Sequence, residues 1–188
     1  VIISTKGRLI AEEPYISILR ECNAVVQVSM VCSSYDKLEP GAPTFEERLR
    51  MVEALAGSCR RVIVRAQPYM TQVRREFLGN VPRFAEAGAY GVTVEGMKFK
   101  KAKPGLVKVR GDFCYPEDLL ETHYALIRDA CHGNGLAFFC AENRLRPMGD
   151  SYACCGCGDL PGFEGNPFNA VSILNGREVE PTERMREV

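Results

Sequence analysis

Short runs of β-branched and other apolar residues alternate with longer segments of helical periodicity along the first 141 residues of this chain. The short runs are typical of strands, whereas the longer segments repeat apolar residues at the spacing of a helix. The predicted strands cover residues 1–5, 24–30, 61–67, 90–95 and 136–140. Because every helix lies between two strands, the order predicts βαβ units with right-handed crossovers and a mainly parallel sheet. On this pattern alone the sheet is either doubly wound or part of a β/α barrel.

Local signals mark the ends of several predicted helices. Thr44 and Glu47 have the spacing of a capping box, so a helix is expected to begin directly after Thr44. Another helix is expected to end near Gly88, because glycine is favoured just beyond a helix end. Pro116 can open a further helix, since the first turn does not need the amide hydrogen that proline lacks. The alternation of strand and helix therefore extends to residue 140.

The remaining residues differ in character from this regular part. Residues 142–188 are rich in Gly, Pro and Cys, and charge dominates residues 177–188. We therefore expect two regions, with residues 1–141 forming the sheet and its helices and residues 142–188 an irregular extension with a peripheral charged tail. The chain begins at Val1, without Met or a basic leader, inside what resembles a strand. We expect that upstream sequence is missing.

Charge and cysteine content exclude several classes of protein. The 24 Lys and Arg residues balance 24 Asp and Glu residues, so no overall field attracts nucleic acid or a membrane. No apolar run approaches the roughly 18 residues that a membrane span needs, so no membrane partner is expected. Nine cysteines are an odd number, too sparse for a disulfide scaffold, and no secretory leader precedes them. We expect reduced thiols in a cytoplasmic protein.

Polar residues occupy alternate positions near the ends of the first four strands. These residues are Ser4, Lys6, Gln27, Ser29, Arg65, Gln67, Thr93 and Glu95. Ligands of parallel sheets bind at the carboxyl ends of strands, so we expect a polar cleft there. Lys6 and Arg65 could hold a carboxylate while Glu95 takes an ammonium or ribose hydroxyl, which suits a zwitterionic ligand with a nucleoside. The alternative is a network of polar side chains that satisfy one another.

A family resemblance rests on four segments: Ser-Thr-Lys6, Val28-Ser-Met, Leu38-Glu-Pro-Gly-Ala-Pro-Thr-Phe-Glu-Glu-Arg-Leu49 and Val64-Arg-Ala-Gln-Pro68. Together they resemble radical S-adenosylmethionine enzymes, and the spore photoproduct lyase-like branch in particular. The resemblance covers roughly residues 1–140. It implies an α/β fold in which residues 1–141 form a partial parallel (β/α) barrel, similar to half a TIM barrel, followed by the irregular Cys/Gly-rich C-terminal extension.

The resemblance also implies a cofactor and a reaction. S-adenosylmethionine would lie at the strand ends, and the residues expected to bind it are Lys6, Ser29, Arg65, Gln67, Pro68 and Glu95. In the family a 4Fe-4S cluster reduces this cofactor, and the resulting 5′-deoxyadenosyl radical abstracts hydrogen from a substrate, which is unknown here. The cluster motif Cys-x3-Cys-x2-Cys is absent from these 188 residues. The simplest interpretation is a C-terminal portion of a longer enzyme, with its first strand equivalent to the third of the family's barrel, unable to generate the radical alone.

A second hypothesis is a noncatalytic α/β binding module with a C-terminal structural zinc or thiol cluster. Four thiolates near the end of the chain are candidate ligands for zinc or an auxiliary iron-sulfur cluster: Cys140, Cys154, Cys155 and Cys157. Their spacing matches no zinc pattern, and adjacent cysteines rarely ligate one ion. A metal site and a cluster of reduced thiols therefore both remain open.

A basic loop follows the fourth predicted strand and emerges on the same rim as the expected cleft. Its lysines are Lys98, Lys100, Lys101, Lys103 and Lys108. A solvated loop is the default interpretation, and a surface for nucleic acid or a phosphorylated substrate is the functional one. Tyr69 and Glu142 are weaker candidates for substrate contact. His123 and His132 are expected to serve packing or helix capping and receive no role.

Overall fold

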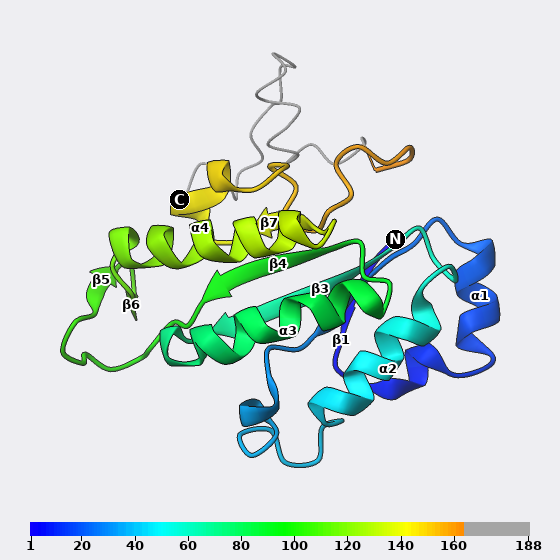
Figure 1. Ribbon diagram of the computed structural model, residues 1–188, viewed down its shortest axis with the longest axis horizontal. Coiled ribbons are helices and arrows are strands. Elements are labelled where there is room, and N and C mark those ends of the chain that lie inside the picture. Colours follow the sequence, from blue (N-terminus) through cyan, green and yellow to red (C-terminus); the bar gives the residue numbers. More distant parts are fainter. Residues whose placement is uncertain (164–188) are drawn as a thin grey trace.

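Five parallel strands form the main sheet of the computed structural model, which describes residues 1–163 (Figure 1). The strands are β1 (Ile2–Thr5), β2 (Val25–Ser29), β3 (Arg61–Tyr69), β4 (Gly91–Gly96) and β7 (Ala137–Cys140). They lie in the order β1-β2-β3-β4-β7, and every neighbouring pair is parallel. A doubly wound sheet would reverse its strand order at a switch point. This sheet never reverses, so the predicted partial β/α barrel is confirmed.

Helices connect successive strands and cover one face of the sheet (Figure 1). They are α1 (Tyr15–Glu21), α2 (Phe45–Leu55), α3 (Arg74–Glu86) and α4 (Glu117–Gly133), with short 3-10 turns η1 (Arg8–Ala11), η2 (Ser33–Tyr35), η3 (Thr71–Val73) and η4 (Asn143–Met148). The main core contains Val26, Val64 and Val92 from the strands, packed with Phe77 and Phe84 of α3. Apolar residues at alternate strand positions therefore face the helices, as the β-strand period requires.

The local signals at the helix ends act as predicted. The Thr44 hydroxyl accepts a hydrogen bond from the Glu47 amide at 3.3 Å, and the Glu47 carboxylate accepts one from the Thr44 amide at 2.7 Å. This reciprocal capping box satisfies two amides at the start of α2. Gly88 has φ of 81° after α3, a conformation that favours glycine, and Pro116 is the N-cap of α4.

The predicted basic loop contains a hairpin that the sequence pattern did not reveal. β5 (Val107–Val109) pairs antiparallel with β6 (Asp112–Cys114), and Phe99 bridges to Phe113. Each strand has only three residues. Such short strands do not build up a recognisable alternation of apolar and polar residues.

The face of the sheet opposite the helices, here called the inner face, carries the other alternate residues. Val25 of β2, Ile63 of β3 and Phe139 of β7 form a second apolar cluster with Cys157. Arg61 donates to the Gly156 carbonyl at 2.7 Å and thereby ties the same segment to the sheet. Part of the C-terminal extension thus covers the inner face. The division at residue 141 stays a prediction, and the charged tail lies outside the described residues.

No helix in the described part of the chain has the length and apolar character that crossing a membrane requires.

Candidate functional site

A chain of hydrogen bonds crosses four strands on the inner face, near their carboxyl ends. Ser4 donates through its hydroxyl to Gln27 Oε1 at 2.7 Å, and Arg65 Nη1 donates to the same oxygen at 2.8 Å. Arg65 Nε donates to Gln67 Oε1 at 2.6 Å, and Gln67 Nε2 donates to the Glu95 carboxylate. We call these five side chains, Ser4, Gln27, Arg65, Gln67 and Glu95, the polar ladder. It joins three of the six predicted cofactor-binding residues directly.

Strand register explains why these side chains meet. Ser4 pairs with Gln27, Ser29 with Arg65, and Arg65 with Thr93 across the parallel ladders. Paired residues in neighbouring strands point to the same face, and residues two apart along a strand do so as well. The polar positions therefore align across β1 to β4, whereas the valines between them face the helices.

Charge of both signs accompanies the polar ladder. Lys98 Nζ donates to Glu95 Oε1 at 2.5 Å, and this hydrogen bond raises the pKa of Lys98. Glu142 lies close enough to raise the Lys98 pKa further, and Arg144 Nε contacts Glu142 at 3.3 Å. Glu95 is buried to 9% exposure beside these cations. The site thus offers a guanidinium, an ammonium and carboxylates within one region, as a zwitterionic ligand would need.

Thr93 lies on the inner face at the level of Arg65, and its hydroxyl is buried. Its Oγ1 is buried and unpaired among the described residues, and the residue is only 2% exposed. Thr93 pairs in register with Arg65 on one side and Phe139 on the other. A buried hydroxyl without a partner costs about 1–3 kcal/mol. A bound ligand could supply the missing partner.

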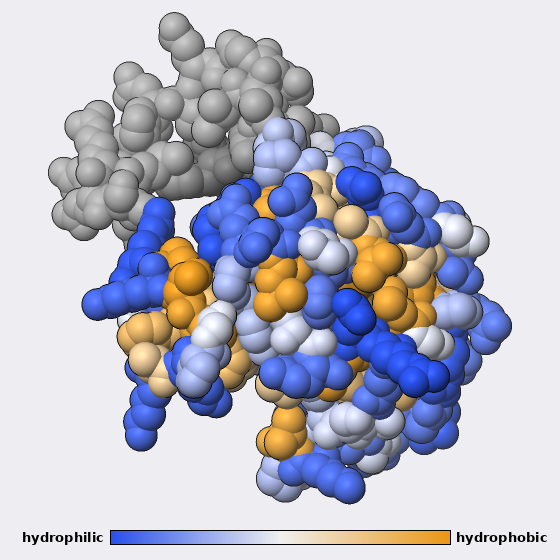
Figure 2. Space-filling model, turned by 60° about the vertical axis from the view of Figure 1, so that its left-hand side comes forward, coloured by the Kyte–Doolittle hydropathy of each residue, from blue (hydrophilic) through white to orange (hydrophobic). Residues whose placement is uncertain are grey.

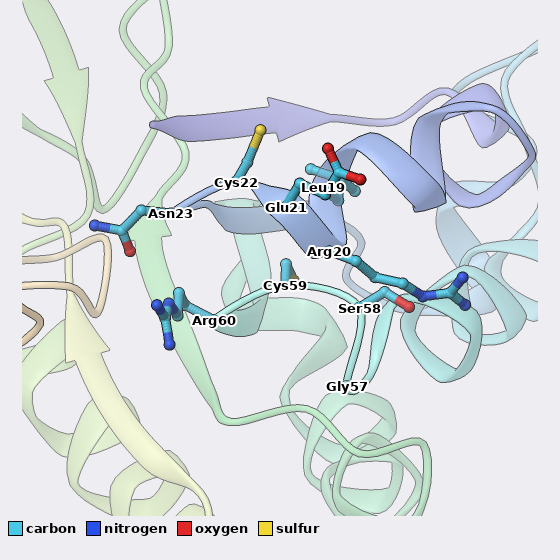
Figure 3. A pocket seen from close by; sticks show the side chains of 9 residues that line it. All are labelled: Leu19, Arg20, Glu21, Cys22, Asn23, Gly57, Ser58, Cys59 and Arg60. Carbon is cyan, nitrogen blue, oxygen red and sulfur yellow. The ribbon is translucent and has the colours of Figure 1, made fainter.

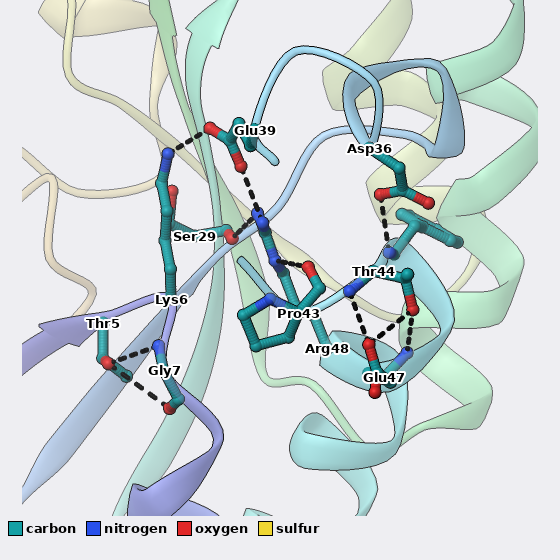
Figure 4. A network of polar contacts seen from close by, with 11 residues as sticks. Thr5, Lys6, Gly7, Ser29, Asp36, Glu39, Pro43, Thr44, Glu47 and Arg48 are labelled. Carbon is teal, nitrogen blue, oxygen red and sulfur yellow. Dashed lines mark hydrogen bonds and ion pairs between the residues drawn. The ribbon is translucent and has the colours of Figure 1, made fainter. Parts of the chain in front are cut away.

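Lys6 takes part in a second network at the same end of the sheet (Figure 4). Its ammonium pairs with Glu39, and Arg48 Nη2 donates to the other Glu39 oxygen at 2.6 Å. Arg48 also donates to the Ser29 carbonyl at 2.9 Å and to the Pro43 carbonyl at 2.7 Å. The three hydrogen bonds of one buried guanidinium fix the loop after β2 against the end of that strand. We call Lys6, Glu39 and Arg48 the anchor network.

The anchor network keeps Glu39 ionised. Burial by itself raises the pKa of Glu39, but hydrogen bonds and charge from Lys6 and Arg48 outweigh it, so the pKa lies below its ordinary value. Lys6 is therefore neutralised by a partner within the chain, although 42% of its side chain remains exposed. An incoming carboxylate would have to share this ammonium with Glu39.

The six predicted cofactor residues thus divide into three settings. Arg65, Gln67 and Glu95 belong to the polar ladder, and the anchor network contains Lys6 and contacts the backbone of Ser29. Pro68 stands apart, because its carbonyl accepts a hydrogen bond from the Tyr35 hydroxyl at 3.0 Å, in a contact toward the helix side. All six lie at the carboxyl ends of β1 to β4.

The four predicted metal-ligating cysteines do not gather at one point. Cys140 packs in the main core on the helix side, and its thiol donates to the Glu142 carbonyl at 3.5 Å. Cys155 and Cys157 lie with their sulfurs 3.0 Å apart, and Cys157 belongs to the cluster on the inner face. Successive side chains of β7 point to opposite faces of the sheet, so Cys140 lies on the helix side, whereas Phe139, which packs with Cys157, lies on the inner face. Within residues 1–163, no group of three or more His, Cys, Asp or Glu side chains is arranged to hold a metal ion.

Tyr69 does not reach the rim, contrary to the prediction. The register between β3 and β4 shifts after Ala66, and Tyr69 is fully buried on the helix side. Its hydroxyl lies 2.9 Å from His123 Nδ1, so His123 serves core packing, as expected. A shift of register moves a side chain to the other face of a sheet. Glu142, in contrast, does lie near the rim charges.

Several lysines of the basic segment have partners within the chain. Lys98 pairs with Glu95, Lys100 pairs with Asp112 at 2.7 Å, and Lys103 lies over the Phe99 ring at 4.8 Å. Lys101 and Lys108 are exposed. In Figure 2 the side of the molecule with β5 and β6 faces the viewer. The surface of the described residues on this side is largely hydrophilic, with separate hydrophobic patches.

Sequence reasoning missed the residues that hold the site together. Glu39 and Arg48 lie within the segment that carries the family resemblance, but their direct contact joins positions nine residues apart across a loop. Lys98 is one of several lysines in the basic loop, and the sequence did not indicate that it pairs with Glu95. The sequence places Thr93 on the same face as Glu95, because the two residues are two positions apart in one strand. Only the three-dimensional packing shows that the Thr93 hydroxyl has no hydrogen-bond partner among the described residues.

A separate pocket of about 380 Å³ lies at the opposite end of the strands (Figure 3). It is formed by the end of α1 and the loop between α2 and β3, and Arg20, Cys22, Cys59 and Arg60 are among the residues that line it. Ligands of parallel sheets bind at the carboxyl ends of strands. This pocket is therefore not part of the polar ladder or the anchor network.

The solved structures that this chain resembles include two of spore photoproduct lyase. One is a spore photoproduct lyase mutant with bound AdoMet and dinucleoside spore photoproduct, at a TM-score of 0.59 and 14% identity, covering 73% of this chain and 49% of that one. The other is spore photoproduct lyase complexed with dinucleoside spore photoproduct, at a TM-score of 0.61 and 13% identity, covering 74% and 51%. The chain thus spans about half the length of these proteins. No protein-family model and no curated protein matches the sequence. At these identities the likeness shows that the chain shares its fold with part of spore photoproduct lyase.

Proposed function

We propose that this chain belongs to a radical S-adenosylmethionine enzyme and that its inner face binds S-adenosylmethionine at the carboxyl ends of β1 to β4. The polar ladder carries this proposal, because it places charged and hydrogen-bonding groups on the helix-free face of a partial barrel. The unpaired hydroxyl of Thr93 lies in register with the ladder. The neighbour with bound AdoMet supports the choice of ligand.

The residues present fit the polar parts of S-adenosylmethionine. Arg65 can donate to the carboxylate of the methionyl group, and guanidinium with carboxylate is among the strongest hydrogen-bonded pairs in proteins. Glu95 can accept from the ammonium group or from a ribose hydroxyl. Gln27, which already accepts from Arg65 and Ser4, orients the guanidinium. Lys6 and Ser29 lie at the ends of β1 and β2, where they would border the same ligand.

Bound S-adenosylmethionine supplies a 5′-deoxyadenosyl group for hydrogen abstraction. The chain's contribution is to position that molecule and to pair with its charges, with Glu95 placed beside Lys98. The described residues do not fit the iron-sulfur cluster, because no three thiols gather among them and the Cys-x3-Cys-x2-Cys motif does not occur in the sequence.

The proposed substrate contains nucleotides. Both solved neighbours are complexes with a dinucleoside. In this chain, Lys98 is bonded to Glu95 at the rim, and Lys101 and Lys108 in the segment that follows are exposed. Ammonium groups beside the cofactor site would attract phosphates at short range, even though the chain as a whole has no net charge.

Calorimetric titration of S-adenosylmethionine into the purified protein tests the proposed site. Arg65→Met removes the guanidinium but keeps an unbranched side chain, and it should weaken binding by about 1.5–3 kcal/mol, or roughly 10- to 150-fold. 5′-Methylthioadenosine, which lacks the carboxylate, should bind the variant and the wild-type protein equally. That difference between ligands separates loss of a specific contact from general disruption of the fold.

Arg83→Met is the matched control. Arg83 pairs with Glu46 between two helices, on the opposite face from the polar ladder. This substitution should leave the affinity for S-adenosylmethionine unchanged. The assignment of the inner face is rejected if wild-type protein does not bind S-adenosylmethionine, or if Arg65→Met and Arg83→Met bind it equally well.

A further inference from the structure

Cys155 and Cys157 form a close pair of thiols that the proposed cofactor site does not use. Their sulfurs are 3.0 Å apart, and one thiol donates to the other. Cys155 is partly exposed, whereas Cys157 is 5% exposed and packs with Val25, Ile63 and Phe139. A disulfide requires sulfurs about 2.05 Å apart. Approach by about 1 Å would therefore bring this pair to bonding distance.

The turn between the two cysteines is held firmly against the sheet. Gly156 has φ of 68°, and a Cβ atom added there would lie 2.8 Å from Phe139 Cε2 and 2.9 Å from Ile63 Cδ1. Glycine is thus required both by backbone conformation and by space. The same tight turn directs the side chains on either side of Gly156 toward each other.

Arg61 fixes the position of this turn. Its guanidinium donates to the Gly156 carbonyl at 2.7 Å and to both Asp159 oxygens at 2.5 and 2.7 Å, and it lies 3.8 Å from the centre of the Tyr90 ring. Gly156 lies between the two cysteines, and Asp159 follows them in the same loop. Burial, together with the hydrogen bond between Cys155 and Cys157, raises the pKa of Cys157 to about 12, and the positive charge of Arg61 acts in the opposite direction. One side chain from β3 therefore both holds the loop and places a cation beside the sulfurs.

The geometry points to Cys155 and Cys157 as a dithiol site that low-molecular-weight disulfides oxidise reversibly to an intrachain disulfide. Cys155, the more exposed thiol, attacks a sulfur of the small disulfide as a thiolate, forms a mixed disulfide and releases one small thiol. Cys157 then attacks the Cys155 sulfur and releases the second small thiol. The two protein thiols lose two electrons and two protons, and the small disulfide gains both to become two thiols.

Mass spectrometry after alkylation tests this site directly. The reduced protein is incubated with mixtures of reduced and oxidised glutathione, free thiols are trapped with iodoacetamide, and the peptide that contains residues 153–163 is examined. We expect this peptide to lose two alkyl groups together as oxidised glutathione increases, and to regain both when reduced glutathione is restored. Cys22 and Cys59, which line the separate pocket, serve as internal controls and should remain alkylated.

Single substitutions distinguish the two roles. Cys157→Ser should leave Cys155 trapped as a mixed disulfide with glutathione. Cys155→Ser should leave Cys157 free of glutathione, because Cys157 is buried, and it is then alkylated when iodoacetamide is added in denaturant. Cys154→Ser is the matched control and should keep the reversible loss of two alkyl groups. The inference is overturned if both thiols stay alkylated in excess oxidised glutathione, or if the disulfide formed contains Cys154. Neither result bears on cofactor binding, so failure here is distinct from failure of the proposed function.

Discussion

Replacing Thr93 by Val separates the stability of the free protein from its affinity for a ligand. The two side chains have nearly the same shape, and Val suits a β-strand. In the free protein the Thr93 hydroxyl is buried without a partner, so the substitution removes an unsatisfied group. Such a group costs about 1–3 kcal/mol, and we expect Thr93→Val to stabilise the free protein by about 1 kcal/mol. Most substitutions of buried residues have the opposite sign.

The same substitution should weaken binding of S-adenosylmethionine. If the hydroxyl gains a hydrogen bond from the ligand, its loss costs about 1 kcal/mol, or roughly a fivefold increase in Kd. Urea unfolding with and without the ligand measures both effects, since a ligand that binds only the folded state stabilises it according to its occupancy. The free variant should unfold at higher urea concentration than the wild type, and the added ligand should shift it less.

Thr122→Val provides the matched control for this experiment. The Thr122 hydroxyl is exposed on α4 and donates to the Asp118 carbonyl at 2.9 Å. This control should change stability by no more than about 0.5 kcal/mol and should not affect the ligand. A Thr93→Val variant that is less stable than the wild type would refute the reasoning, because the hydroxyl would then have a favourable interaction in the free protein.

Three further predictions concern the anchor network and the turn at Gly156. Arg48→Met should lower the free energy of unfolding in urea by about 3–5 kcal/mol, because it leaves Glu39 and two carbonyl groups without their buried partner, and a loss below 1 kcal/mol would contradict this role. The folded-state pKa of Glu39 lies below its ordinary 4.5, so its stabilising contribution is present above that pH and is lost as the pH falls through the folded pKa. The free energy of unfolding, measured as the pH is lowered through this range, should therefore fall less steeply in Glu39→Gln than in the wild type. Parallel falls in the two proteins would contradict the stabilising role of Glu39. Gly156→Ala should destabilise the protein by about 1–3 kcal/mol in thermal unfolding, since the added methyl group meets Phe139, and an unchanged Tm would show that the turn relaxes freely.

Much of the architecture followed from patterns that are local in the sequence. The strands alternate polar and apolar residues, and Thr44, Gly88 and Pro116 mark helix ends through their own backbone chemistry. The predicted polar ends of β1 to β4 meet on one face because register in a parallel sheet converts local alternation into spatial alignment. Sequence alone left the doubly wound sheet open, and the observed order of strands excludes it.

The parts that escaped prediction depend on contacts between distant segments. Tyr69 was misplaced because strict alternation was assumed along β3, whereas the register shifts after Ala66, and Pro68 within the strand is the local signal of that shift. The four cysteines were grouped by their closeness in the chain, yet Cys140 faces the helices while Cys157 lies on the other side of the sheet. Arg48 appeared to be one of many charged helix residues, and only the folded structure shows that it joins the end of β2 to the loop that follows it.

The separation of the two faces of the sheet has a consequence for how such a protein can change over time. Positions such as Arg65 and Glu95 can accept new side chains, and hence new ligands, without disturbing the valines that pack beneath the helices. Insertion or deletion of a single residue within β3 would exchange the two sets, burying a guanidinium among apolar side chains and exposing Val64 to water. Length variation among descendants of this chain should accordingly collect in the connections between strands and helices, while the strands diverge by substitution alone.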